Sequence, residues 1–215
     1  LDKVFNYLDA VTPPQMVNKK TNEVVADVAK IDSNTVLQKA DFRLTSYEWG
    51  VTYSAMLWAG EITGDKKYTK YAKDRFNFLA TWIPAVKKLK AAGGYSGNTY
   101  PLKQPIEPHA LDDAGAVCAA MIKATTAGVN NNLRQQIDVY ADWVTKKEYR
   151  LPDGTLARMR PQKNTLWLDD LYMGVPTLAQ MGKLTGDKKY FDDAVNQVKL
   201  YTQRMFIKEK GVYMH

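Results

Sequence analysis

One six-residue segment, TGDKKY, occurs twice in the chain, at Thr63–Tyr68 and at Thr185–Tyr190. In both places it joins a strongly apolar helical pattern to an amphipathic one. Its glycine is suited to ending a helix, and the aspartate that follows is suited to capping the next one. Nearly identical turns at equivalent places in two helix pairs indicate an internal repeat of about 60 residues. The chain is therefore predicted to fold as tandem helical hairpins.

Three hairpins can be traced, with first helices that begin near Tyr47, His109 and Thr165. The first helix of each pair is apolar on nearly all sides, whereas the second has a single apolar stripe. A linear stack of such pairs would expose one side of every apolar helix, and a closed double ring would hide it. The pattern therefore predicts an all-α fold of the α/α toroid type, with the apolar helices inside.

The rest of the chain is predicted from its helix breakers. Residues 1–10 suit a short amphipathic helix that stops at Pro13-Pro14, residues 15–45 are expected to be mostly loop, and residues 84–108 form a long Pro- and Gly-rich loop. The long loops precede the inner helices, so the cavity mouth is expected at that end. At 215 residues the chain is predicted to be a single domain spanning 1–215.

Composition narrows the classes of partner and cofactor. The net charge of +7 favours an anionic ligand, yet the lysines are scattered in pairs without any nucleic-acid motif. No run approaches the ~18 apolar residues that a membrane helix needs. The single cysteine, Cys118, and two histidines exclude a disulfide, a cysteine cluster and a histidine-rich metal site. We expect neither a nucleic acid nor a membrane as partner.

Two pairs of aspartates stand at the starts of apolar helices, Asp112-Asp113 in HALDDAG and Asp169-Asp170 in TLWLDDLYMG. An ionised carboxylate among apolar residues is costly unless it is paired, hydrogen-bonded or used in chemistry. Either pair could simply cap its helix and complement the helix dipole. For Asp112 and Asp170, capping or structural hydrogen bonding is the preferred interpretation. For Asp113 and Asp169 the residues alone leave capping and chemistry evenly matched.

Three separated motifs resemble those of one enzyme family. The W-x-D-D-L-Y-M element at Trp167–Met173, the H-x-L-D-D-x-G element at His109–Gly115 and the E-W-G element at Glu48–Gly50 are similar to those of the unsaturated glucuronyl and rhamnogalacturonyl hydrolases, glycoside hydrolase families 88 and 105. The resemblance runs from about Tyr47 to the end of the chain. It implies an (α/α)6 barrel, of which this chain would hold about three hairpins plus an N-terminal helix, with the C-terminal part missing.

The resemblance also implies an activity. Such an enzyme hydrates the C4=C5 double bond of a 4,5-unsaturated uronic acid, which releases that sugar from the non-reducing end of a lyase-generated oligosaccharide. Matching the motifs places the proton donor and water activator on Asp169. The second functional aspartate, which positions the sugar and the water, falls on Asp113. No metal and no organic cofactor is implied.

Candidate substrate-binding residues come from the matched motifs and the expected rim of the toroid. Arg158 stands eleven residues before Asp169, where members of the family usually carry a histidine, and Arg160 follows it. Either guanidinium could bind a uronate carboxylate in a bidentate manner. The complete candidate set is Arg43, Trp49, His109, Asp112, Arg158, Arg160 and Trp167.

Two other functions stay open at this stage. One is another α/α-barrel sugar enzyme, such as an epimerase or a mannan hydrolase, and the other is a non-catalytic helical-repeat scaffold. The expected partner is an unsaturated uronyl oligosaccharide. The resemblance is to bacterial enzymes and leaves periplasm and cytoplasm open, with the periplasm favoured.

Overall fold

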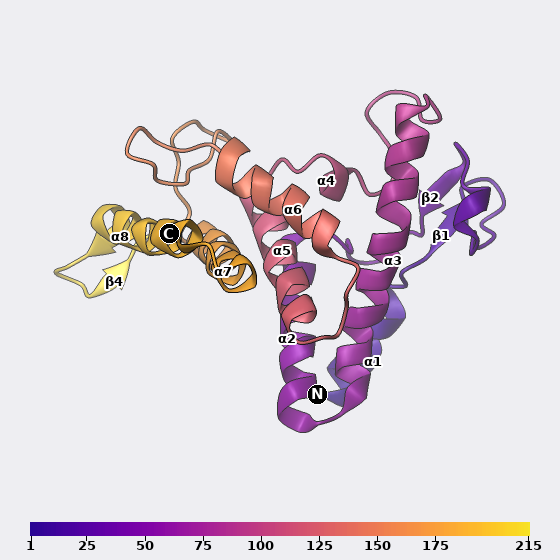
Figure 1. Cartoon of the computed structure of the whole chain (residues 1–215), viewed down its shortest axis with the longest axis horizontal. Helices are drawn as coiled ribbons and strands as arrows, with labels where there is room; N and C mark the ends of the chain where they lie inside the picture. The colour runs from indigo at the N-terminus through magenta and orange to yellow at the C-terminus, as the bar shows by residue number, and fades with distance from the viewer.

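The computed structural model describes all 215 residues (Figure 1). Eight α-helices account for most of the chain, and six of them form three helical hairpins. The fold is therefore all-α and of the α/α type, as the apolar patterns predict. The hairpins are α2 (Tyr47–Thr63) with α3 (Lys66–Ala91), α5 (Leu111–Thr126) with α6 (Arg134–Asp142), and α7 (Leu168–Thr185) with α8 (Lys188–Met205).

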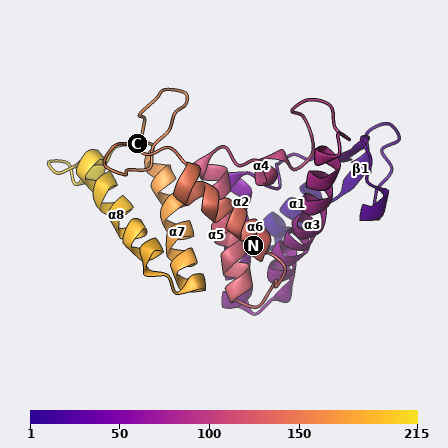
Figure 2. The ribbon, with the colours of Figure 1, turned by 45° about the horizontal axis from the view of Figure 1, so that its top comes forward.

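The hairpins stand side by side in two layers (Figures 1 and 2). Helices α2, α5 and α7 form the inner layer with α5 in the middle, and α3, α6 and α8 each cover their own partner. Two glycines allow this close packing. A Cβ on Gly50 would lie 2.4 Å from the carbonyl carbon of Ala116, and a Cβ on Gly115 would lie 2.4 Å from the carbonyl oxygen of Met173. The inner helices therefore approach one another almost backbone to backbone.

The core lies mainly between the first two hairpins and is rich in aromatic rings. Tyr53 is fully buried, and its ring packs edge-on against Phe76. Trp58, on the same helix, is 62 % exposed. It lies on the open side of α2, where no further helix covers the inner layer.

The N-terminal part agrees only partly with its predictions. Helix α1 (Asp2–Val11) is present and packs on α3 through the ring of Phe5, which contacts Tyr68 edge-on. Within residues 15–45, expected to be mostly loop, two short antiparallel strands pair around a 3-10 turn. These elements are β1 (Met16–Asn18), η1 (Val28–Lys30) and β2 (Thr35–Leu37).

The predicted loop at residues 84–108 starts too early. Helix α3 continues through Pro84 to Ala91, and only then does the loop begin, with α4 (Lys103–Ile106) inside it. A proline within a helix costs about 3 kcal/mol. Buried Trp82, Ile83 and Val86 flank this proline, and their packing offsets that cost.

The two ends of the hairpins differ (Figure 2). At one end the inner and outer helices are joined by short turns, and the repeated TGDKKY turns are built alike. Gly64 and Gly186 both adopt a left-handed conformation, while Asp65 and Asp187 each accept a hydrogen bond from the backbone two residues on. The long loops, residues 92–110 and 148–167, lie at the opposite end, where the inner helices begin.

The chain ends in a small hairpin after α8, in which β3 (Phe206–Ile207) pairs with β4 (Val212–Tyr213). Helix α6 runs on into one π-helical turn, η2 (Trp143–Lys147). None of the helices combines the length and the apolar character that crossing a membrane requires.

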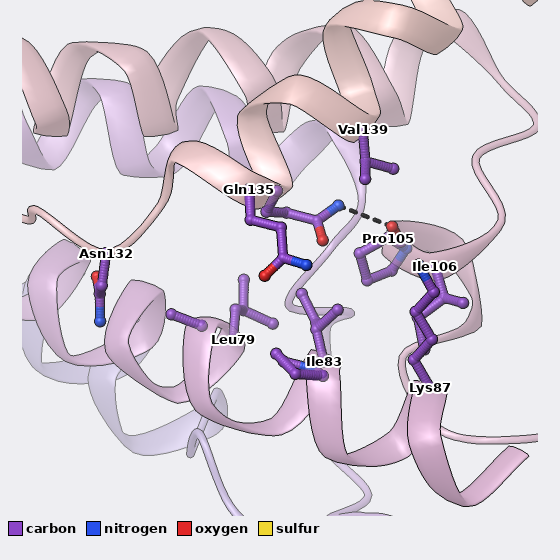
Figure 3. A pocket seen from close by; sticks show the side chains of 11 residues that line it. Leu79, Ile83, Lys87, Pro105, Ile106, Asn132, Gln135 and Val139 are labelled. Atoms are coloured by element: carbon purple, nitrogen blue, oxygen red, sulfur yellow. Dashed lines mark hydrogen bonds between the residues drawn. The ribbon is translucent and has the colours of Figure 1, made fainter. Parts of the chain in front are cut away.

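A narrow groove lies between the outer helices α3 and α6 (Figure 3). Leu79 and Ile83 face Gln135 and Val139 across it, and α4 closes one end. These side chains leave a volume of about 50 Å³, which holds water molecules but is too small for a sugar ring. The groove is therefore a packing feature of the outer layer.

Candidate active site

The three inner helices all begin at the end that carries the long loops, and each has acidic residues in its first turn. A helix N-terminus favours negative charge because its first N–H groups point outward unpaired. Neighbouring inner helices thus bring five carboxylates into one region. They are Glu48 on α2, Asp112 and Asp113 on α5, and Asp169 and Asp170 on α7.

One guanidinium neutralises two of these carboxylates. Arg158 donates from Nε and Nη2 to both oxygens of Asp170, at 2.5 and 2.7 Å, and from Nη2 to Asp112 at 3.2 Å. The Asp170 side chain is only 1 % exposed, so the carboxylate of this bidentate pair is buried. Asp112 and Asp170 are thus both held by an arginine from the preceding loop, and Asp170 does not cap its own helix.

Asp113 is held by a different element. One of its oxygens accepts a hydrogen bond of 2.8 Å from the backbone N–H of Tyr47, the first residue of α2. The other oxygen receives no hydrogen bond from the protein. Burial raises the pKa of Asp113, and the nearby charges of Arg43 and the Tyr47 hydrogen bond oppose this rise. Asp113 thus caps a neighbouring helix while one oxygen stays free.

Asp169 has no ion pair and no hydrogen bond, although its Oδ1 is buried. Buried acceptors without a partner are rare, and they concentrate where a ligand or a water completes the site. Asp169 and Asp113 are thus the two aspartates of the cluster that Arg158 does not bind.

The phenol of Tyr47 lies where these charges converge. Its pKa is raised chiefly by the charge of Glu48, with burial and the charges of Asp112, Asp169 and Asp113 adding to the effect. The charges of carboxylates on all three inner helices therefore act on one hydroxyl. Tyr47 is the first residue of α2, and no sequence motif marked it as a site residue.

The two candidate tryptophans lie in different surroundings. Trp167 is 38 % exposed, and the guanidinium of Arg158 lies over its ring at 4.2 Å from the centroid. Trp49 is only 3 % exposed, stacks on Phe42, and donates its indole N–H to the hydroxyl of Tyr71. The predicted place of Trp49 at the rim is therefore wrong, because its indole is buried against α3 and its N–H is already satisfied.

The remaining candidates lie in the loops that precede the inner helices. Arg160 and His109 are exposed, and Nη2 of Arg160 donates to the backbone carbonyl of His109. Arg43 is exposed and forms no ion pair. Arg158 was one of two arginines that could bind a sugar carboxylate, and its guanidinium is bound to Asp170 and Asp112.

Glu148, just after η2, belongs to the same region and was missed by sequence reasoning. Burial raises its pKa to about 7, and its Oε1 accepts a hydrogen bond from the N–H of Tyr149. The only sequence signal was a single acid within the basic segment KKEYR. A lone acid in a basic segment matches no motif spacing, so the sequence could not identify Glu148 as a site residue.

One known protein family matches nearly the whole chain. The family model described as Glycosyl Hydrolase Family 88 matches residues 10–215. No curated protein sequence matches the chain significantly.

Solved structures show the fold. The chain is similar to possible members of the GH105 family from Salmonella enterica serovar Paratyphi A and from Klebsiella pneumoniae, with 18 % identity to each and TM-scores of 0.60 and 0.62. Each match covers 100 % of this chain and 49 % of the other. A family 105 glycoside hydrolase from C. acetobutylicum gives 19 % identity and a TM-score of 0.60, over 81 % of this chain and 45 % of that one. The hairpins thus form part of an (α/α)6 barrel, and the chain spans about half the length of these structures.

Proposed function

Because the chain belongs to Glycosyl Hydrolase Family 88, we propose that it serves in the cleavage of a glycosidic bond at the starts of α5 and α7. The substrate proposed is an oligosaccharide that ends in a 4,5-unsaturated uronic acid. The observation that supports this most directly is the division of the aspartate cluster. Arg158 binds Asp112 and Asp170, whereas Asp113 and Asp169 keep oxygens without any protein partner.

In the proposed reaction Asp169 acts as both acid and base. Its carboxylic acid gives a proton to C4 of the double bond, and its carboxylate takes a proton from the water that adds at C5. The resulting hemiketal at C5 rearranges, and the bond to the next sugar breaks. The spacing rule for the carboxylate pairs of ordinary glycosidases does not apply, because no direct displacement at the anomeric carbon occurs.

Asp113 would orient the sugar and the water. The Tyr47 N–H holds one of its oxygens, which leaves the second to accept a hydrogen bond from a sugar hydroxyl or from water. This hydrogen bond holds the Asp113 side chain in one orientation, as a group that positions a substrate requires. Its role is thus distinct from that of Asp169, which has no fixed partner.

The uronate carboxylate needs a cation that is not already paired. Arg158 is occupied, so this role passes to Arg43, whose charge acts on Asp113. Trp167, half-exposed beside Arg158, offers a ring against which a sugar can pack.

The test is the loss of ultraviolet absorbance from the C4=C5 bond when the protein is mixed with lyase-generated disaccharides. Asp169→Asn should abolish this loss at unchanged helicity, whereas Asp138→Asn, an exposed aspartate on α6, should leave it unchanged. A fully active Asp169→Asn would refute the assignment. Consumption of a saturated sugar in place of the unsaturated one would favour another α/α-barrel sugar enzyme. Binding of a partner that is unchanged by substitution of Asp113 and Asp169 would favour a non-catalytic scaffold.

A further inference from the structure

A second cavity, of about 200 Å³, lies beside the aspartate cluster. Three segments line it: the residues at the start of α5, both ends of η2 with the residues that follow it, and the loop before α7. Arg158 lines this cavity and also binds Asp112 and Asp170, so its side chain is the wall between the two sites. The lining includes His109, Trp143, Lys147, Glu148, Arg158 and Arg160.

The cavity carries an excess of positive charge. Arg160 makes no ion pair, and one of its N–H groups is fixed by the carbonyl of His109 at 2.9 Å. Its remaining N–H groups are free of protein partners. Lys147 adds a second cation, paired only at 3.4 Å with exposed Asp142. An arginine that is anchored through the backbone and has no carboxylate partner is well suited to bind an anion from solution.

Glu148 is the one acid in the lining. Its pKa of about 7 follows first from burial, and the charge of Asp170 on α7 adds to the rise, while Arg160 and Arg158 oppose it. The charge of Glu148 in turn helps to raise the pKa of the Tyr201 hydroxyl on α8. Below neutral pH the group is therefore uncharged and can donate a hydrogen bond to an anion.

We propose that this cavity is a subsite for a carboxylate-bearing sugar on the part of the substrate beyond the cleaved bond. Arg160 pairs with the carboxylate, Glu148 donates a hydrogen bond to it, and the ring of Trp143 packs against the sugar. The volume is smaller than the roughly 300 Å³ of common small-molecule pockets, which suits one acidic substituent and part of its ring. The assignment rests on the proposed function for the direction in which the sugar chain runs.

The test measures binding, not turnover, so it also gives an answer if the proposed hydrolysis is absent. Saturated digalacturonate, which has no double bond to hydrate, is titrated by calorimetry, with its dimethyl ester as the neutral probe. Arg160→Ala should weaken digalacturonate binding at least tenfold and leave ester binding within twofold. Lys163→Ala, which removes an exposed cation from the same loop outside the cavity, should change neither. Equal binding by wild type and Arg160→Ala would overturn the proposal.

A separate titration, followed by nuclear magnetic resonance, tests where digalacturonate binds. Digalacturonate should shift the indole N–H signal of Trp143, identified by its loss in Trp143→Phe. A digalacturonate complex that leaves this signal in place would mean that the anion binds elsewhere, for example at Arg43, and would also overturn the proposal.

The contribution of Glu148 has its own signature. As pH rises through about 7 the carboxyl ionises and repels the ligand, so digalacturonate affinity should fall several-fold between pH 6 and pH 8. Glu148→Gln, which stays neutral, should flatten this dependence, and His109→Gln isolates any part due to the imidazole. Identical pH profiles for wild type and Glu148→Gln would contradict the role given to Glu148.

Discussion

Replacing Arg158 by methionine tests how the aspartate cluster is held together. The change keeps a long side chain against Trp167 but removes both hydrogen bonds to Asp170, which is 1 % exposed. Loss of one partner from a buried ion pair costs about 3–5 kcal/mol, because the other charge is left without compensation. The lost cation–π contact with Trp167 adds about 0.5–1 kcal/mol. We expect Arg158→Met to lower the free energy of unfolding by about 4 kcal/mol.

The chain contains its own matched control. Arg150 binds both oxygens of Asp193 in the same bidentate manner, but the two side chains are 23 and 24 % exposed. Water can replace part of that interaction, so Arg150→Met should cost clearly less. Urea denaturation followed by circular dichroism measures both variants. If Arg150→Met destabilises as much as Arg158→Met, the reasoning from burial is refuted.

Two further measurements separate charge from shape. In Arg158→Met the counter-ion of Asp170 is gone, so protonation of this carboxyl on acidification should recover part of the lost stability relative to wild type. The double variant Arg158→Met, Asp170→Leu removes both charges and should recover most of it at neutral pH. A deficit that persists unchanged in both experiments would assign the effect to packing and not to charge.

Three further predictions concern the site and its support. Asp169→Asn should lower activity by at least a hundredfold without changing the thermal midpoint, checked by ultraviolet turnover and circular dichroism. The pKa of Glu148 is raised from its ordinary 4.5 to about 7, so between these pH values the folded state binds more protons than the unfolded state. The free energy of unfolding should therefore fall by up to about 3 kcal/mol as pH rises from 4.5 to 7. Urea titrations at several pH values should show this decrease in wild type and not in Glu148→Gln. Gly115→Ala should destabilise the fold by about 1–3 kcal/mol, because the new methyl group would clash with backbone atoms. In Gly174→Ala the methyl group would lie 3.0 Å from the end of a leucine side chain, which can move, so this variant should lose less stability in thermal melts.

The parts of the fold that sequence reasoning found are those governed by local rules. The TGDKKY turns predicted two hairpins because a left-handed glycine and a capping aspartate act within a few residues. The apolar inner helices predicted the layering for the same reason. The loop expected from Pro84 was wrong because buried neighbours on α3 outweigh the local cost of a proline, and no local pattern reveals that burial.

The candidate site shows the same division. Spacing placed four aspartates at helix starts, but nothing in the sequence indicates which of them Arg158 binds, since its partners lie on two different helices. Trp49 was misplaced because one turn of a helix decides whether a ring faces the mouth or the core. Glu148 was missed because its raised pKa comes chiefly from burial, which no local sequence pattern reveals.

The short-turn end of the hairpins offers a place to fasten the protein to a solid support. Inner helix α7 is 18 residues long, so its far end lies about 25 Å from Asp169. A cysteine introduced at exposed Lys188 would be the one reactive thiol, because the native Cys118 is buried. A sensor chip or resin coupled there would leave the carboxylates facing the solution, with the whole length of a helix between the attachment and the sugar.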